Sequence, residues 1–312
     1  MRSQTFIVLA VFSACWIGPI VNGSEIYFED GNTHVINYST DSYVYIDRNK
    51  PGLGTQLEIV QGAVLKHAFT AMEDSRVSVK SGSVLGNAWA WDRSCVSVQS
   101  GANIANIDAE DNSKINIYGG IISDSLNSHL DSEISIYGGQ IYSLYLWQRS
   151  IASITGGTFG YAIDAKDDSQ MTINSVNIAY DLTTEGHAKV NFAGGSIGRV
   201  LQAWEDSALV VSGGTIQSYI GAGHPTQFWD TSTITIVGSN FAINGIPVAY
   251  GSYFASDYSS GWLSGTFASG EVFNNSFYIY DAASIVLTPE PGTILLLGFG
   301  AAIASKKAKR KR

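Results

Sequence analysis

The chain is poor in cysteine and in charged side chains. It has two cysteines in 312 residues, and Cys15 lies in an apolar N-terminal stretch, which leaves Cys95 alone in the rest of the chain. A lone cysteine excludes an internal disulfide, so a core and backbone hydrogen bonds must hold the body together. Charged residues make up only 14% of the chain and glycines number 33, a composition typical of many tight turns and few helices.

Basic side chains are especially scarce between the two ends of the chain. Residues 24–288 contain 11 basic and 26 acidic residues, a net charge of −15 against −9 for the whole sequence. A surface this acidic repels nucleic acid, so we expect no DNA or RNA partner. The acids could bind calcium between repeats, although the chain lacks the glycine- and aspartate-rich nonapeptides of calcium-binding rolls.

Signatures of cofactor sites are also missing. The sequence contains no phosphate-binding loop and no dinucleotide fingerprint. The five histidines show no metal-ligand spacing; they are His34, His67, His129, His187 and His224. We therefore expect no cofactor and no metal centre, and we assign no catalytic residue.

One short phrase recurs at a fixed spacing. Ile134-Ser-Ile-Tyr-Gly-Gly139 has close copies ending at Gly120, Gly157, Gly195 and Gly214, and weaker ones ending at Gly62, Gly82, Gly101, Val176 and Ser239. The steps between these ten ends are 20, 19, 19, 19, 18, 19, 19, 19 and 25 residues. A period near 19 over most of the chain predicts a solenoid of stacked coils.

Apolar and polar residues alternate within each repeat. Apolar side chains stand five and three residues before the second glycine, as at Ile134 and Ile136, and again two residues after it, as at Ile141. This alternation predicts strands with one face inward, and the glycine pair predicts a corner. We therefore predict an all-β fold, a single-stranded parallel β-helix (a β-solenoid) with coils of about 19 residues and a right-handed winding. The period leaves open whether each coil has two or three strands.

Most repeats have a serine seven residues before the second glycine, often after an acid, as at Asp131-Ser132. Asp and Ser satisfy free backbone donors in turns, which predicts a second corner whose serines bond to the next coil. Beyond Asn240 the period fails. We expect residues 24–55 to form N-terminal capping strands, residues 56–240 the coils, and residues 241–288 the C-terminal capping strands that cover a blunt apolar end.

Two groups of side chains are candidates for carbohydrate chemistry. Parallel β-helices include polysaccharide lyases and hydrolases, which use clustered acids. The acids cluster here as Asp108, Glu110 and Asp111, and as Asp164, Asp167 and Asp168. Their place at a repeated corner favours solvated turn carboxylates over catalysis. Four tryptophans in the variable half of the coils could stack on the sugar rings of an exopolysaccharide, or instead cover the core; they are Trp89, Trp91, Trp147 and Trp204.

The N-terminal residues 1–23 are typical of a signal peptide. Arg2 is followed by an apolar run from Phe6 to Val21, and Gly23 is a small residue suited to cleavage before Ser24. Phe12-Ser-Ala-Cys15 is an alternative lipid-attachment site. The sequence favours ordinary cleavage, because the apolar run continues past Cys15. Either reading predicts an exported protein.

The C-terminal residues 289–312 have three parts in order. Pro289, Glu290 and Pro291 come first. An apolar segment from Thr293 to Ala304 follows, which includes Leu295, Leu296, Leu297, Phe299 and Ile303, and the chain ends in the basic cluster Lys306, Lys307, Lys309, Arg310, Lys311 and Arg312. Twelve apolar residues are fewer than the ~20 of a full span, yet the segment suits a short membrane crossing with its basic end in the cytoplasm.

This three-part end resembles the PEP-CTERM sorting signal of exported bacterial proteins. The resemblance covers the last 24 residues. It implies recognition by an exosortase, a membrane protease that would cut near Pro289-Glu-Pro291 and release the body to the cell surface or extracellular matrix. We therefore expect a precursor held briefly in the inner membrane, with a structural or adhesive role outside the cell. The alternative is a carbohydrate-active β-helix resembling a polysaccharide lyase or a glycoside hydrolase.

Overall fold

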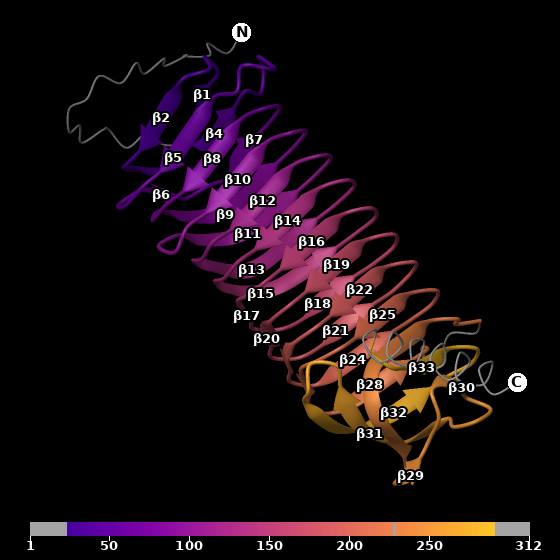
Figure 1. Ribbon diagram of the computed structural model, residues 1–312. Coiled ribbons are helices and arrows are strands. Elements are labelled where there is room, and N and C mark those ends of the chain that lie inside the picture. The colour runs from indigo at the N-terminus through magenta and orange to yellow at the C-terminus, as the bar shows by residue number, and fades with distance from the viewer. Residues whose placement is uncertain (1–23, 227–228, 291–312) are drawn as a thin grey trace, which may run out of the picture.

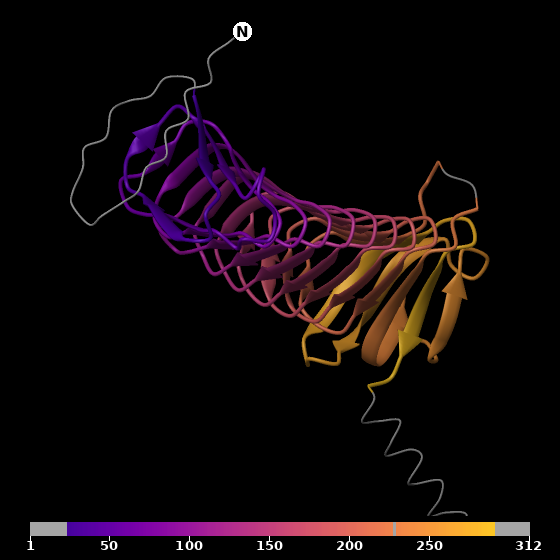
Figure 2. The same cartoon turned by 90° about the horizontal axis from the view of Figure 1, so that it is seen from above.

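The computed structural model describes residues 24–226 and 229–290, which form one continuous β-solenoid of about ten turns (Figure 1). Seen along its side, it is a rod of stacked coils that ends in a small sheet (Figure 2). All regular elements among the described residues are strands, and almost all pair in parallel with the strand one coil away. The predicted all-β parallel solenoid with coils of about 19 residues is therefore confirmed. The right-handed winding stays a prediction.

Each coil contributes to three parallel ladders. The first ladder consists of β2 (Thr33–Ile36), β5 (Gln56–Ile59), β8 (Arg76–Val79), β10 (Cys95–Val98), β12 (Lys114–Ile117), β14 (Glu133–Ile136), β16 (Ile151–Ile154), β19 (Gln170–Ile173), β22 (Lys189–Phe192), β25 (Ala208–Val211), the first half of β28 (Thr233–Ile243) and β33 (Ser284–Thr288). Strands stacked ~4.8 Å apart give a rod of roughly 50 Å.

The second and third ladders follow the glycine corner. The second consists of β3 (Ser39–Thr40), β6 (Val64–Leu65), the starts of β9 (Ser83–Ala90), β11 (Asn103–Ala109), β13 (Ile121–Ser128) and β15 (Gln140–Leu146), then β17 (Thr158–Phe159), β20 (Val176–Ile178), β23 (Gly195–Ile197) and β26 (Thr215–Ile216). The third consists of β1 (Glu25–Phe28), β4 (Tyr43–Ile46), β7 (Phe69–Ala71), the ends of β9, β11, β13 and β15, then β18 (Ile163–Ala165), β21 (Leu182–Thr184), β24 (Val200–Ala203), β27 (Tyr219–Ala222) and β32 (Val272–Ile279).

The core is one column of apolar side chains that runs the length of the rod. Ile134 stands opposite Ile115 on one side and Ala152 on the other, so equivalent residues of successive coils pack on each other. Both predicted inward positions of the first ladder are buried along the whole repeat. The third ladder adds an alanine from many coils, such as Ala109 and Ala165, whose small size lets the ladders approach at the corner that follows.

That corner is a tight turn with one residue in the left-handed region. The turn is closed by the serine N–H, which donates to the carbonyl three residues earlier, as from Ser132 to His129. The residue two before the serine has φ between 56° and 62° in Glu73, Asp92, Asp111, Leu130, Gln148, Asp167 and Glu205. Its own N–H is satisfied in several coils by the same position of the next coil, because Asp167 Oδ2 accepts from Gln148 N–H at 2.9 Å. Polar side chains therefore recur here to complete the backbone hydrogen bonding.

The corner serines are buried but bond less regularly than predicted. Ser207 and Ser232 donate their hydroxyls to carbonyls of the preceding coil, Thr184 at 3.0 Å and Ala203 at 2.8 Å. Five others have no partner for the hydroxyl among the described residues, namely Ser75, Ser94, Ser113, Ser150 and Ser169. Their backbone N–H groups still close the turn. The serine column therefore serves mainly as a small residue inside a tight bend.

The two ends of the rod differ. Residues 24–55 form the first turn of the same ladders, since β1 pairs in parallel with β4 and β2 with β5. At the other end, β28 leaves the first ladder at Gly238 and continues into an antiparallel sheet with β29 (Ile246–Pro247) and β31 (Ser260–Phe267). β30 (Gly251–Phe254) covers β33, and β31 covers β32. The closing strands expected in residues 241–288 are therefore present as a small antiparallel cap.

The expected signal peptide, residues 1–23, lies outside the described residues. So do Pro291, the apolar segment and the basic cluster of the C-terminal tail. Of the sorting motif, Pro289 and Glu290 are described, and they follow β33 directly. No helix long and apolar enough to cross a membrane occurs in the described part of the chain.

Candidate functional site

Aromatic and charged side chains gather on the outward face of the third ladder. A column on this face, which we call the turn-side column, contains the residue that follows each third-ladder strand. It is continuous, because each backbone N–H in it donates to the preceding coil, and it consists of Trp91, Glu110, His129, Trp147, Lys166, Glu185 and Trp204. Three of the four predicted tryptophans therefore share one column, three coils or ~14 Å apart.

Trp89 lies in the neighbouring column, which we call the inner column. Strand register sets its members opposite one another as Trp89, Asp108, Asn127, Tyr145, Asp164, Thr183 and Gln202. Asn127 Nδ2 donates to Asp108 Oδ1 at 2.7 Å, and Gln202 Nε2 donates to Thr183 Oγ1 at 3.2 Å. Polar side chains on this face thus bond along the rod axis, from coil to coil.

Two acids on this face have unusual protonation behaviour. Burial raises the pKa of Glu110, to which Asp111 and Asp108 add repulsion while His129 acts in the opposite direction. Burial also raises the pKa of Asp164, opposed by a hydrogen bond with Thr183 and by Lys166. Low water access around a carboxyl favours its neutral form. These two acids are the candidates for proton chemistry on this surface.

The rings of this region stack on one another rather than facing solvent. The Trp147 indole lies parallel to the His129 ring at 6.2 Å between centroids, and Lys166 Nζ lies 5.0 Å from its centroid. Because His129 and Lys166 come from the two neighbouring coils, both faces of this indole are occupied. His224 packs edge-on against Trp204 at 4.8 Å. Sugar stacking needs an open ring face, so these two tryptophans are poor platforms for it.

Trp91 is the most open of the four tryptophans, at 38% exposed, and Trp89 beside it is half-buried. Both belong to the end of β9, and Glu110 and Asp108 lie one coil further along the same columns. This group offers an indole surface next to carboxylates, a combination suited to a polyhydroxylated ligand. We name Trp89, Trp91, Asp108 and Glu110 the β9 patch.

A stack of tyrosines lies at the edge between the second and third ladders. Tyr142 and Tyr161 are 5.7 Å apart with an interplanar angle of 11°, Tyr180 lies 5.1 Å from Tyr161, and the guanidinium of Arg199 covers Tyr180 at 5.7 Å. Arg199 is held by both carboxylate oxygens of Asp181, which raises the pKa of Arg199. Their equal position in four successive coils is the sequence signal for this stack.

The two acid clusters are divided by the fold. Asp108 and Glu110 point outward from the third ladder, whereas Asp111 is the left-handed residue of the following turn. In the second cluster, Asp164 is on the third ladder, and Asp167 is occupied by the backbone N–H of Gln148. Neither cluster lies in a cleft built from loops, since strand partners between β8 and β25 are 18 or 19 residues apart and leave no room for an insertion.

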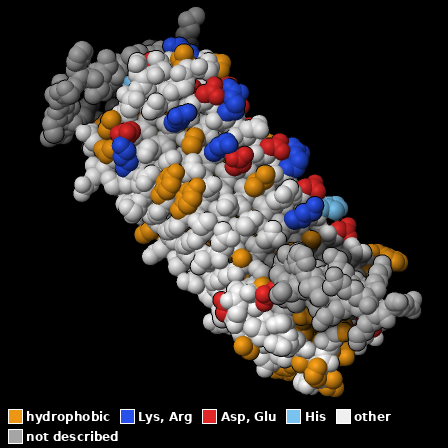
Figure 3. Space-filling model, viewed as in Figure 1, with side chains coloured by type: hydrophobic (Ala, Val, Ile, Leu, Met, Phe, Trp, Pro, Cys, Tyr) orange, Lys and Arg blue, Asp and Glu red, His pale blue; other side chains and the backbone are white. Residues whose placement is uncertain are grey.

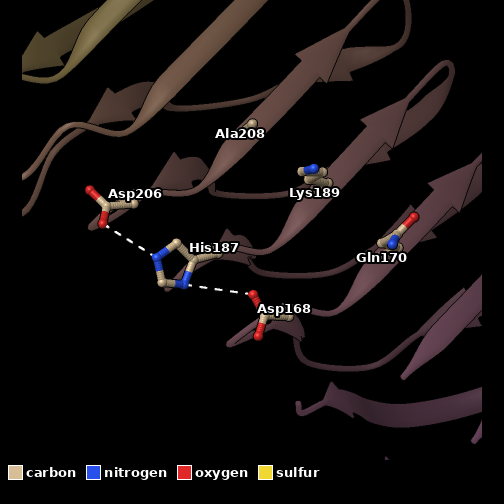
Figure 4. A pocket seen from close by; sticks show the side chains of 6 residues that line it. All are labelled: Asp168, Gln170, His187, Lys189, Asp206 and Ala208. Carbon is tan, nitrogen blue, oxygen red and sulfur yellow. Dashed lines mark ion pairs between the residues drawn. The ribbon is translucent and has the colours of Figure 1, made fainter. Parts of the chain in front are cut away.

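A shallow, open hollow of about 460 Å³ lies on the turn side of the first ladder (Figure 4). Figure 4 shows His187 between Asp168 and Asp206, with Nδ1 3.7 Å from one carboxylate and Nε2 3.6 Å from the other. Lys189, Gln170 and Ala208 complete the lining. All three ionisable groups of the column are more than half exposed, so water screens the charges. The carbohydrate-active alternative would have its best-formed site here.

One stretch, Gly194-Gly-Ser-Ile-Gly198, matches the Gly-x-Ser-x-Gly pattern of hydrolases. In those enzymes the serine stands on a sharp turn between a strand and a helix. Here Ser196 lies within β23, paired with Asn177 and Thr215, and its hydroxyl donates to Asn177 Oδ1 at 2.9 Å. This serine is therefore part of a strand ladder and has no nucleophile geometry.

Among the described residues, no three His, Cys, Asp or Glu side chains gather in a way that could hold a metal ion. No protein-family model matches the chain, and no curated protein or solved structure is significantly similar to it. The resemblance of the C-terminal tail to a sorting signal therefore depends on the residues of the tail alone.

Proposed function

We propose that this protein is an exported, non-catalytic β-solenoid with a structural or adhesive role at the cell surface or in the extracellular matrix. The observation that carries the proposal is the uninterrupted run of coils from β8 to β25, with partners one period apart and no inserted loop. Loops usually build the clefts of enzymes, and solenoids without them offer long, regular surfaces. Its acidic, disulfide-free body suits life as a soluble rod outside the cell.

The tail gives the proposed route to that location. Pro289 and Glu290 come directly after the last strand of the solenoid, β33. Cleavage there by an exosortase-type protease would leave every strand of the rod intact. Before cleavage, the apolar segment would hold the precursor in the inner membrane, and the basic end would stay in the cytoplasm. Contact with an exopolysaccharide would involve the β9 patch, because Trp91 has the most accessible ring of the four tryptophans.

The sorting part of the proposal is tested by intact-mass measurement of the protein extracted from the cell surface. We expect a mature chain that begins near Ser24 and lacks Lys306 to Arg312. Recovery of the basic cluster in surface protein would refute processing at the tail. A Glu290→Ala variant in the sorting motif should accumulate in the membrane fraction at its precursor mass.

The carbohydrate part is tested on a glycan array with the full chain. Trp91→Ala should lower binding to any acidic or neutral polysaccharide that the protein retains, whereas Tyr118→Ala, which removes an exposed ring elsewhere, should not. Release of reducing ends from a bound polysaccharide, abolished by His187→Ala, would favour the carbohydrate-active alternative and would contradict a non-catalytic role.

A further inference from the structure

The capped end of the rod exposes large apolar side chains close together. We call Ile246, Tyr250, Phe254 and Trp262 the distal tip; they are 66%, 47%, 43% and 58% exposed. Figure 3 shows hydrophobic side chains gathered at this lower end, whereas the long face above it is mostly polar. Single exposed apolar residues are ordinary on a protein surface, but a cluster at one end indicates a contact surface.

The tip is built from rigid elements. Asn244 and Gly245, with φ of 51° and 79°, form the two-residue turn that carries Ile246 at the end of a hairpin. Trp262 lies beside this turn, because its N–H donates to Asn244 Oδ1 at 3.0 Å and its carbonyl accepts from Asn244 N–H at 2.9 Å. Tyr250 packs edge-on against Phe241 with its centroid at 5.9 Å. The fold therefore holds these side chains outward.

The chain leaves the solenoid next to this tip. Leu287 of the last strand, β33, pairs with Gly251, the residue after Tyr250. Pro289 to Gly292 are the four residues between Thr288 and the start of the apolar segment at Thr293. At ~3.4 Å per residue, five steps of extended chain reach at most ~17 Å. A body anchored through that segment must therefore keep its capped end within a few ångströms of the lipid headgroups.

The charge of the cap suits such a contact. Residues 241–288 contain three acids, Asp257, Glu271 and Asp281, and no Lys or Arg. Few charges need to lose water when this end approaches lipid, and none attracts an anionic headgroup. Trp and Tyr are the residues that prefer the boundary between headgroups and hydrocarbon.

We propose that the distal tip is a membrane-contact surface which rests in the interface of a zwitterionic bilayer while the precursor is anchored, so that the rod stands on its capped end. This inference rests on the proposed function, because it needs the apolar segment in the membrane. It adds a second, protein-side contact that the tail alone does not require.

The test uses the full chain with Cys15→Ser and Cys95→Ser, reconstituted into phosphatidylcholine vesicles. A single cysteine is placed at Ser252, an exposed position on β30, and in a matched protein at Ser153, an exposed position in mid-rod on β16. Each is labelled with a nitrobenzoxadiazole probe. We expect nitroxide-labelled lipid to quench the Ser252→Cys probe about twofold or more, and to leave the Ser153→Cys probe unquenched.

The triple variant Ile246→Ser, Phe254→Ser, Trp262→Ser should still float with the vesicles but lose quenching at position 252. A matched variant that replaces three exposed rings in mid-rod, Tyr118, Tyr142 and Tyr161, by serine should keep it. Co-flotation with equal probe signals at positions 252 and 153 would overturn the inference and leave the tail anchor standing. Failure to float at all would overturn the tail anchor and the inference together.

Discussion

The glycine at the corner after β22 provides the sharpest test of the stacked-coil architecture. Gly195 has φ of +107°, and a Cβ built there would lie 1.9 Å from the carbonyl oxygen of Val176 in the preceding coil. Real Cβ contacts are essentially never shorter than 3.0 Å. Gly195→Ala must therefore move β23 away from β20 by about 1 Å, which breaks ladder hydrogen bonds.

The magnitude follows from two costs. A non-glycine residue at positive φ costs about 1–2 kcal/mol, and backbone groups left unpaired cost about 1–3 kcal/mol each. We expect Gly195→Ala to destabilise the protein by about 3–5 kcal/mol, which lowers Tm by about 6–20 °C in a domain of this size. Gly245→Ala is the matched control, because it has φ of +79° but no atom within 4 Å of the added Cβ. It should lower Tm by only about 2–4 °C.

The assay is thermal unfolding followed by circular dichroism, with hydrogen exchange of the amides in β20 and β23 as a local readout. Opening should be faster in Gly195→Ala at these two strands and at their immediate neighbours. A Gly195→Ala protein that melts within about 2 °C of the unmodified chain, or a Gly245→Ala protein that is less stable than it, would contradict close stacking at this corner.

Other substitutions test the core, the buried acid, the first turn and the surface pairs. Ile136→Ala removes a side chain with 0% exposure and should cost about 2–5 kcal/mol in chemical denaturation. Asp164→Asn should raise Tm at pH 7, because burial disfavours the charged carboxylate and raises its pKa, and the gain should vanish in acid, where Asp164 is neutral; a lower Tm at pH 7 would reverse this sign. Asp30 has a pKa of about 2, since burial raises it but hydrogen bonds from Asn32 and His34 lower it more, so its contribution is present above about pH 4 and lost towards pH 2; Asp30→Asn should flatten the dependence of Tm on pH in that window. Arg149→Ala breaks an exposed pair and should leave Tm within about 2 °C; a larger loss would show that surface pairs carry more stability than we infer.

The first ladder was predictable from sequence because its chemistry is repetitive. A strand with one face in the core requires an apolar residue at every second position, and Ile134 and Ile136 meet this requirement in register with their equivalents. Each coil has the same length, so the period gives the stacking as well. The closing strands were predictable for the opposite reason, since the period stops after Asn240 while strand-like alternation continues.

The third ladder was harder to predict. Its inward residues are few and end in a small one, as in Ile163-Asp-Ala165, and its outward positions carry different residue types in each coil. Trp89 and Asp164 therefore read as a variable region, although register places them in one column. Ring orientation was not predictable either. Whether an indole such as Trp147 is open or covered depends on which side chains stand in the two adjacent coils, and this becomes visible only when the coils are aligned in space.

Equal coils between fixed ends also constrain how such a protein can change its dimensions. Removing residues 133–151 would join Ser132 to Ala152 and misalign the repeat, whereas removing 19 residues from one corner to its equivalent returns the chain to the same position one level lower. Height is therefore adjustable in increments of ~4.8 Å without redesign of either terminus. Duplication of a genetic segment of that length is a ready route to taller or shorter versions of the same molecule.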